Sequence, residues 1–125
     1  MNILVVDDEQ LICELLEEFL TIKGHIVQTA NNGQTAIRQV TKMKPDIVLL
    51  DITMPDMTGL EALKQIREID SSPGIVMLSA FRDEETVQEA MSAGANFYIQ
   101  KPVELDKLIT VLHKWESRKK DDNIE

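Results

Sequence analysis

Residues Pro45–Gly59, PDIVLLDITMPDMTG, form the stretch on which the fold of this 125-residue chain depends. Its five apolar residues, Ile47 to Leu50 and Ile52, enclose one carboxylate, Asp51. An unbroken apolar run between Pro45 and a Thr-Met-Pro-Asp turn predicts a strand buried on both faces, as in a parallel sheet. A carboxylate at the end of such a strand costs roughly several kcal/mol unless another group pairs with it. We therefore expect Asp51 either to be neutralised by a partner or to lie at a sheet edge for chemistry.

The length and composition are typical of one domain with no nucleic-acid or membrane function. Acidic residues outnumber basic ones by 22 to 13, and a net charge of −9 argues against a surface that binds nucleic acid. The single cysteine, Cys13, excludes an intramolecular disulfide. No apolar stretch approaches the roughly 18 residues of a membrane span, and no signal peptide begins the chain. We expect a cytoplasmic domain over residues 1–118 and a charged tail over residues 119–125.

Short apolar runs alternate along the chain with segments of helical periodicity. The predicted strands are Ile3–Val6, Ile26–Ala30, Asp46–Asp51, Ile75–Leu78 and Phe97–Gln100. A helical pattern follows each of them, and Gly24, Thr58, Asp83 and Gly94 mark helix ends. Strict alternation predicts a parallel sheet covered by helices on both faces, with right-handed crossovers. The expected fold is therefore α/β, a doubly wound, five-stranded, three-layer sandwich with the flavodoxin-like strand order 2-1-3-4-5.

Polar residues follow several of these predicted strands. Asp7 and Asp8 follow the first strand, Asp51 ends the third, Ser79 follows the fourth and Lys101 follows the fifth. Ligands of open α/β sheets bind outside the carboxyl ends of the strands, so these side chains are expected to share one edge. Three clustered acids repel one another, which raises their pKa values or recruits a cation, and oxygen ligands suit Mg²⁺.

This set of residues fits phosphoryl transfer. Asp51 is the candidate nucleophile, while Lys101 and Mg²⁺ offset charge on the phosphoryl oxygens and Ser79 donates a hydrogen bond. Single residues also have plainer interpretations. Asp7 and Asp8 are suited to capping the first helix, Lys101 to a resting ion pair with Asp51, and Cys13 to apolar packing.

The motifs that carry these residues resemble the receiver domain of the two-component response regulators over roughly residues 2–117. The matching motifs are Val6-Asp7-Asp8-Glu9, Leu49-Leu50-Asp51 with Met54-Pro55 and Gly59, Leu78-Ser79-Ala80, Gly94-Ala95-x-x-Tyr98 and Lys101-Pro102. Each motif is weak alone, whereas five in register make a specific match. The resemblance implies a signalling phospho-acceptor rather than an enzyme. Its phosphoryl donor would be a sensor histidine kinase or a histidine phosphotransfer protein, and its target a downstream protein.

The resemblance also implies roles for individual residues. Asp51 would accept the phosphoryl group, Asp8 would bind the metal directly and Asp7 would act on it mainly through water. The Thr53 carbonyl would be a further metal ligand.

Ser79 and Tyr98 resemble the family's switch pair, and Lys101-Pro102 its cis peptide bond. Thr53 and Phe81 occupy family-variable positions that tune the phosphoryl lifetime, which leaves that lifetime open.

Three other functions compete with this interpretation. A degenerate receiver would bind partners without phosphorylation, but the intact Asp-Asp-Asp-Ser-Lys set argues against it. A Mg²⁺-dependent aspartyl phosphatase of the haloacid dehalogenase type needs a second aspartate at position 53, where this chain has Thr53. A flavin carrier of the flavodoxin type needs a phosphate-binding first loop, and Asp7-Asp8-Glu9 would repel a phosphate.

Overall fold

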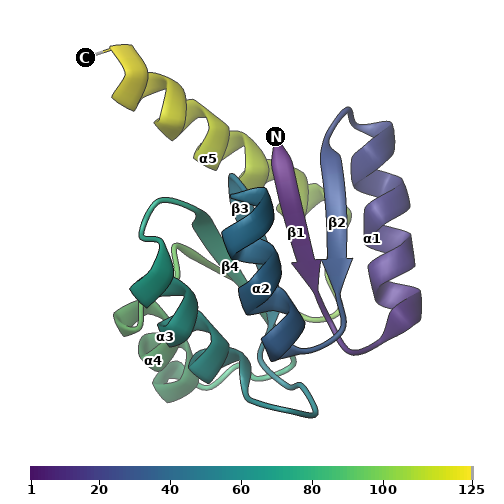
Figure 1. Cartoon of the computed structure of the whole chain (residues 1–125), viewed down its shortest axis with the longest axis vertical. Helices are drawn as coiled ribbons and strands as arrows, with labels where there is room; N and C mark the ends of the chain where they lie inside the picture. The colour runs from purple at the N-terminus through teal and green to yellow at the C-terminus, as the bar shows by residue number, and fades with distance from the viewer. Residues whose placement is uncertain (125) are drawn as a thin grey trace.

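The computed structural model describes the backbone of residues 1–124 and the side chains of residues 1–118. Within them, five strands alternate with five helices: β1 (Asn2–Val6), α1 (Gln10–Ile22), β2 (Ile26–Ala30), α2 (Gly33–Met43), β3 (Ile47–Asp51), α3 (Gly59–Ile69), β4 (Gly74–Ser79), α4 (Glu84–Ser92), β5 (Phe97–Gln100) and α5 (Leu105–Ile124). All strand pairs are parallel and the order is β2-β1-β3-β4-β5 (Figure 1). The predicted doubly wound sheet is confirmed.

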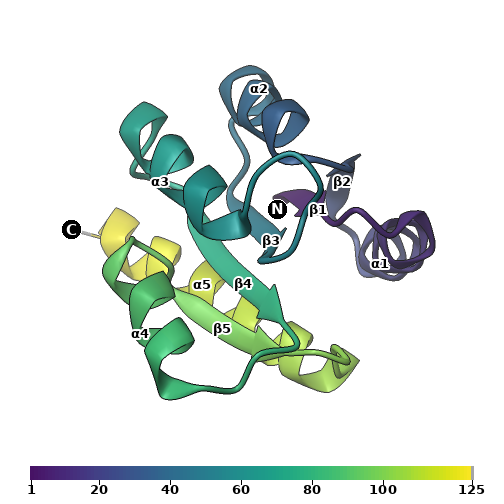
Figure 2. The same ribbon diagram turned by 90° about the horizontal axis from the view of Figure 1, so that it is seen from below.

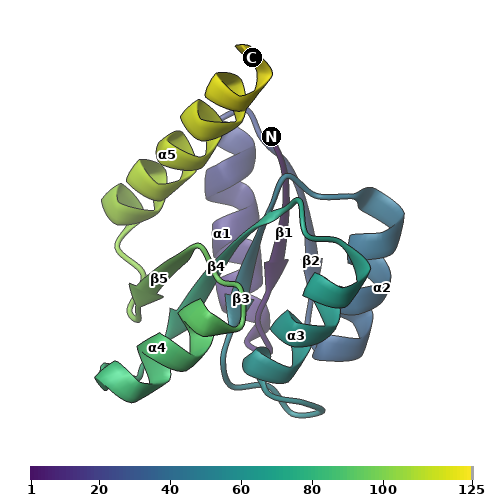
Figure 3. The ribbon, with the colours of Figure 1, turned by 90° about the vertical axis from the view of Figure 1, so that its left-hand side faces the viewer.

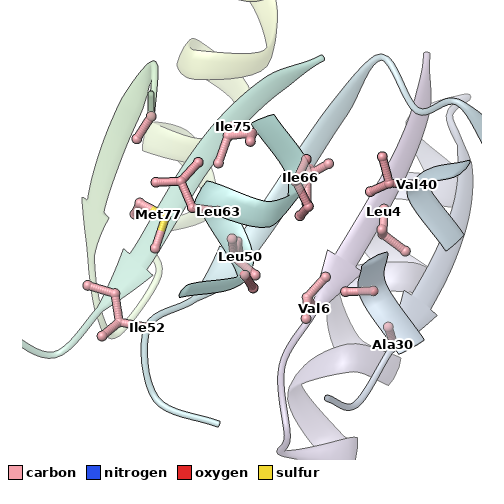
Figure 4. Close-up of a cluster of buried hydrophobic side chains, with 14 of the residues drawn as sticks. Leu4, Val6, Ala30, Val40, Leu50, Ile52, Leu63, Ile66, Ile75 and Met77 are labelled. Atoms are coloured by element: carbon pink, nitrogen blue, oxygen red, sulfur yellow. The ribbon is translucent and has the colours of Figure 1, made fainter. Parts of the chain in front are cut away.

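Helices cover both faces of the sheet, which explains why its central strand is apolar at successive positions. Val48 and Leu50 of β3 belong to a core shared with α2, α3 and α4, and Figure 4 shows Leu50 within it. Ile47 and Leu49 point into the opposite core, which is shared with α1 and α5. Figure 3 shows the strands between α5 on one side and α2 and α3 on the other. All five residues of β3 are buried, so a polar side chain in this strand needs a partner.

The edge strand and the helix ends follow local sequence signals. β2 alternates between exposed and partly buried residues as far as Thr29 and ends at the buried Ala30, and it lies at an edge of the sheet as predicted. Thr58 caps α3 by accepting from the Glu61 amide, and Asp83 caps α4 by accepting from the Thr86 amide. Gly24 and Gly94 follow α1 and α4 with φ of +95° and +115°, a conformation that favours glycine.

Helix α5 continues to Ile124, past the predicted domain boundary at residue 118. The side chains from residue 119 onward, and the whole of residue 125, lie outside the described residues. The charged tail over residues 119–125 therefore stays a prediction. None of the helices in the described chain combines the length and apolar character that a membrane span requires.

Substituting Leu50 tests how far the fold depends on β3. We expect Leu50→Ala to lower the free energy of unfolding by about 2–5 kcal/mol, because it leaves a cavity beneath α3. Leu11→Ala is the matched control: Leu11 is 80 % exposed, and its truncation should change stability by less than about 0.5 kcal/mol. Urea unfolding followed by circular dichroism measures both changes. Similar losses in the two variants would contradict this account of the core.

Candidate functional site

Three carboxylates gather where β1 and β3 end, at the edge of the sheet seen in Figure 2. Asp51 is the last residue of β3, and Asp7 and Asp8 directly follow β1, which pairs with β3. One oxygen from each of the three lies within 4.8 Å of the others. Asp7 is fully buried and Asp51 is 5 % exposed, whereas Asp8 faces solvent. The site thus holds two buried carboxylates and one accessible one.

Lys101 supplies a positive charge to both buried carboxylates. Its Nζ lies 2.9 Å from Asp7 Oδ2 and 3.3 Å from Asp51 Oδ2. The Lys101 amide donates to the Ser79 carbonyl at 2.7 Å, and the Lys101-Pro102 peptide bond is cis. The structure therefore contains the resting ion pair with Asp51, together with a shorter one to Asp7 that the sequence did not predict.

The pKa values reflect this shared charge. Burial raises the pKa of Asp51; the Lys101 charge opposes that rise and the Asp7 charge adds to it. Burial alone would lower the pKa of Lys101, but its hydrogen bond to Asp7 and the charge of Asp51 raise it above its ordinary value. Lys101 therefore stays protonated, while the ionised form of Asp51 is disfavoured.

The structure decides the plainer interpretations of Asp7, Asp8 and Cys13. Glu9, not Asp7 or Asp8, is the N-cap residue of α1, and its side chain makes no capping hydrogen bond. The Asp7 carboxylate instead accepts from the Glu9 amide at 3.0 Å. Cys13 is buried among apolar side chains as predicted, and its Sγ donates to the Asp7 carbonyl at 3.2 Å. Burial, aided by the Asp7 charge, raises the pKa of this thiol to about 11, so it stays protonated at neutral pH.

Ser79 and Tyr98 meet at one peptide segment. Ser79, at the end of β4, is 1 % exposed, and its Oγ accepts from the Phe81 amide at 2.9 Å. The Tyr98 hydroxyl on β5 donates to the Phe81 carbonyl, also at 2.9 Å. The Phe81 backbone is therefore hydrogen-bonded to both residues of the predicted switch pair, a link that the sequence motifs did not indicate.

The loop between β3 and α3 contains Thr53, whose amide donates to Asp51 Oδ1 at 3.3 Å. Farther along this loop, the Asp56 carboxylate accepts from the amides of Gly33 and Gln34 at 2.9 and 3.0 Å. Sequence reasoning missed this contact because its partners are more than 20 positions apart and no local pattern connects them. In the sequence, only the presence of an aspartate in the turn after Pro55 pointed to such a contact.

The donor set suits a hard divalent cation. It consists of oxygen ligands, and Lys101 provides one positive charge against the three carboxylates. Mg²⁺ prefers one or two carboxylates together with water and phosphate oxygens. The exposed position of Asp8 leaves one carboxylate accessible from solvent. These residues therefore fit Mg²⁺, although their individual roles stay predictions.

Comparisons with known proteins agree with this geometry. The family model of the response regulator receiver domain matches residues 3–113. The chemotaxis protein CheY of Thermotoga maritima is 37 % identical over 114 residues, which cover 90 % of this chain and 95 % of CheY. The regulatory protein AtoC of Escherichia coli is 36 % identical over 113 residues, but the match spans 24 % of AtoC and 90 % of this chain.

Solved structures agree as well. A two-component response regulator from Clostridium difficile superposes with a TM-score of 0.92 at 27 % identity, covering 95 % of this chain and 98 % of that one. The BeF3-activated DrrB receiver domain has a TM-score of 0.84 at 27 % identity, covering 93 % of this chain and 97 % of that one.

Replacing Asp51 tests the charge crowding at this site. We expect Asp51→Asn to be more stable than the wild type at pH 7 in EDTA, because it removes a buried charge whose ionisation is disfavoured. A raised folded-state pKa means that ionised Asp51 costs stability above that pKa and costs nothing below the unfolded value. The advantage of the variant should therefore shrink as the pH falls from 7 toward about 4. Urea unfolding across this range measures it, and an advantage that grew in acid would contradict the assignment.

Proposed function

Because the chain belongs to the response regulator receiver domain family, we propose that it accepts a phosphoryl group on Asp51 and then changes its surface for a downstream protein. The donor is a phosphohistidine of a sensor histidine kinase or a histidine phosphotransfer protein. One observation carries the proposal: the Asp51 carboxylate lies at the end of the central strand, within 3.3 Å of Lys101 and beside Asp7 and Asp8. We assign this function to residues 1–118, in the cytoplasm, with residues 119–125 as the charged tail.

The transfer is a displacement at phosphorus. An Asp51 carboxylate oxygen forms a bond to phosphorus while the bond from phosphorus to the donor's imidazole nitrogen breaks. The electron pair of the broken bond stays on that nitrogen. The product is an acyl phosphate on Asp51, which water later hydrolyses to restore the carboxylate.

The surrounding residues prepare this step. The Lys101 ammonium lies 3.3 Å from Asp51 Oδ2 and offsets charge on the transferred group. Mg²⁺ would be held by Asp8, Asp51 and the Thr53 carbonyl, with Asp7 acting through water. When bound, it supplies a divalent charge that offsets the negative phosphoryl oxygens.

A groove beside Lys101 supports a protein as the phosphoryl donor. It has a volume of about 570 Å³ and is lined mainly by apolar side chains of α1 and of the segment after β5, among them Ile12, Leu15, Pro102 and Val103. Lys101 and Ala80 also line it, so the groove reaches the lysine that pairs with Asp51. We assign it to the donor protein, since a partner seated there would lie next to Asp51.

The contacts of Phe81 support the proposed switch. Ser79 Oγ accepts from the Phe81 amide, which leaves its own hydrogen free to donate to a phosphoryl oxygen. Movement of Ser79 toward that oxygen would pull on Phe81 and so disturb the hydrogen bond from Tyr98. Tyr98 and Phe81 line a surface groove of about 520 Å³ with residues of α4 and α5, where a downstream protein would sense the change.

Phosphorylation by a small-molecule donor tests the proposed acceptor. With acetyl phosphate and Mg²⁺, we expect intact mass spectrometry to show one added phosphoryl group. Asp51→Asn or an excess of EDTA should abolish it, because each removes a component of the reaction. Asp70→Asn carries the same charge change away from the site and should still react. A phosphoryl adduct that persists in Asp51→Asn would contradict the assignment of Asp51 as the acceptor.

Replacing Ser79 separates the chemistry from the switch. We expect Ser79→Ala to be phosphorylated on Asp51 but to reach the active surface only partly. One charge-assisted hydrogen bond is worth about 1.5–3 kcal/mol, enough to move a two-state equilibrium by roughly ten- to a hundredfold. NMR shifts in α4, β5 and α5 are compared with those of the wild type at matched phosphorylation. A full wild-type shift pattern in the variant would show that another residue couples the phosphoryl group to this surface.

A further inference from the structure

Asp56 joins the loop after β3 to the start of α2. Each of its carboxylate oxygens accepts one backbone hydrogen bond: Oδ1 from the Gly33 amide at 2.9 Å and Oδ2 from the Gln34 amide at 3.0 Å. These are the first two amides of α2, and the N-cap residue Asn32 accepts from Thr35. Amides of a first helical turn have no partner within the helix and favour negative charge. Asp56 therefore satisfies two donors that Asn32 leaves open.

Apolar packing strengthens the same junction. The Met57 side chain lies so close to Gly33 that a Cβ added there would overlap it. The hydrogen bonds to Gly33 and Gln34 also lower the pKa of Asp56, so the carboxylate is ionised at neutral pH. The loop is thus held to α2 by two charge-assisted hydrogen bonds and one close side-chain contact.

Further hydrogen bonds connect the loop side of this junction to Asp51 and the α2 side to Asp7. On the loop side, Thr53 donates its amide to Asp51, and Gly59 closes the loop by donating to the Ile52 carbonyl at 2.6 Å. On the α2 side, the Asp7 amide donates to the Ala30 carbonyl at 3.1 Å, three residues before the helix begins. Asp56 therefore completes a ring of contacts that runs from Asp51 to Asp7 through α2.

We propose that Asp56 is a positioning residue that holds the β3–α3 loop against α2 and so sets the Thr53 carbonyl and the Asp51 carboxylate relative to Asp7 before Mg²⁺ binds. The proposal rests on the proposed function, since it concerns the same metal site. Asp56 acts through the loop and is not itself a ligand. A preorganised site binds its ion more tightly because less ordering accompanies binding.

The test compares Asp56→Ala and Asp56→Asn with the wild-type chain. Both variants lose one negative charge, but asparagine keeps a side-chain oxygen that accepts a hydrogen bond. A difference between them therefore reports hydrogen bonding rather than charge. Asp70→Ala and Asp70→Asn are the matched controls: Asp70 is partly buried, its carboxylate accepts two hydrogen bonds from Ser72, and it precedes β4 at the opposite end of the sheet.

Two measurements on the unphosphorylated proteins decide the outcome. The first is the Mg²⁺ dissociation constant, from NMR titration with MgCl₂. We expect it to rise about tenfold in Asp56→Ala, by less in Asp56→Asn, and not at all in the Asp70 variants. The second is amide hydrogen exchange without metal. A role confined to capping α2 would speed exchange at Gly33 and Gln34 alone, whereas a positioning role also speeds it at Thr53.

Several results would overturn the proposal. They are an unchanged dissociation constant in Asp56→Ala, equal rises in the alanine and asparagine variants, or unchanged exchange at Thr53. If Asp56→Ala does not fold, Asp56→Asn decides the outcome. We then expect its Mg²⁺ dissociation constant to be higher than that of the wild type, and a value equal to the wild type would contradict the proposal. Wild-type phosphorylation on Asp51 alongside any of these results leaves the proposed function standing. A wild-type chain that neither binds Mg²⁺ nor accepts a phosphoryl group overturns both.

Discussion

Two buried carboxylates share one ammonium group at the end of the sheet, and this charge imbalance constrains the rest of the site. Asp7 and Asp51 lie within 3.3 Å of Lys101, and Asp8 adds a third negative charge beside them. In a low-dielectric environment, such an arrangement persists only where the surrounding structure holds it. The two apolar cores supply that support, because they fix β1 and β3 from both faces.

The position of Lys101 depends on the strand order. β4 lies between β3 and β5, so Lys101 must extend past the end of β4 to reach both aspartates. A flexible four-carbon side chain can span that gap, and the bond from the Lys101 amide to the Ser79 carbonyl fixes the point from which it starts. Ser79 ends β4, which pairs with β3 next to Asp51. Charge compensation and the proposed switch thus share one structural element, the end of β4.

The loops at the carboxyl ends are tied to one another as well as to the sheet. Phe81 connects Ser79 to Tyr98, and Asp56 connects the loop after β3 to α2. These contacts use backbone amides and carbonyls, so they do not depend on the identity of the Phe81 or Gln34 side chains, whereas position 33 needs a glycine because a Cβ there would overlap Met57. A site built in this way can keep its geometry while neighbouring surface residues vary to suit different partners.

The sequence by itself determined the architecture and indicated that Asp7, Asp8, Asp51 and Lys101 lie together at one edge of the sheet. Apolar runs alternating with helical periodicity predicted the parallel sheet and its order, and helix ends such as Thr58 and Gly94 followed from local capping rules. These signals suffice because they act within a few residues along the chain. Only the tertiary structure decided that Lys101 lies closer to Asp7 than to Asp51, that Phe81 bridges Ser79 and Tyr98, and that Asp56 holds α2. Such contacts join segments far apart in sequence, and their geometry depends on how strands and loops are placed in three dimensions, which no local periodicity encodes.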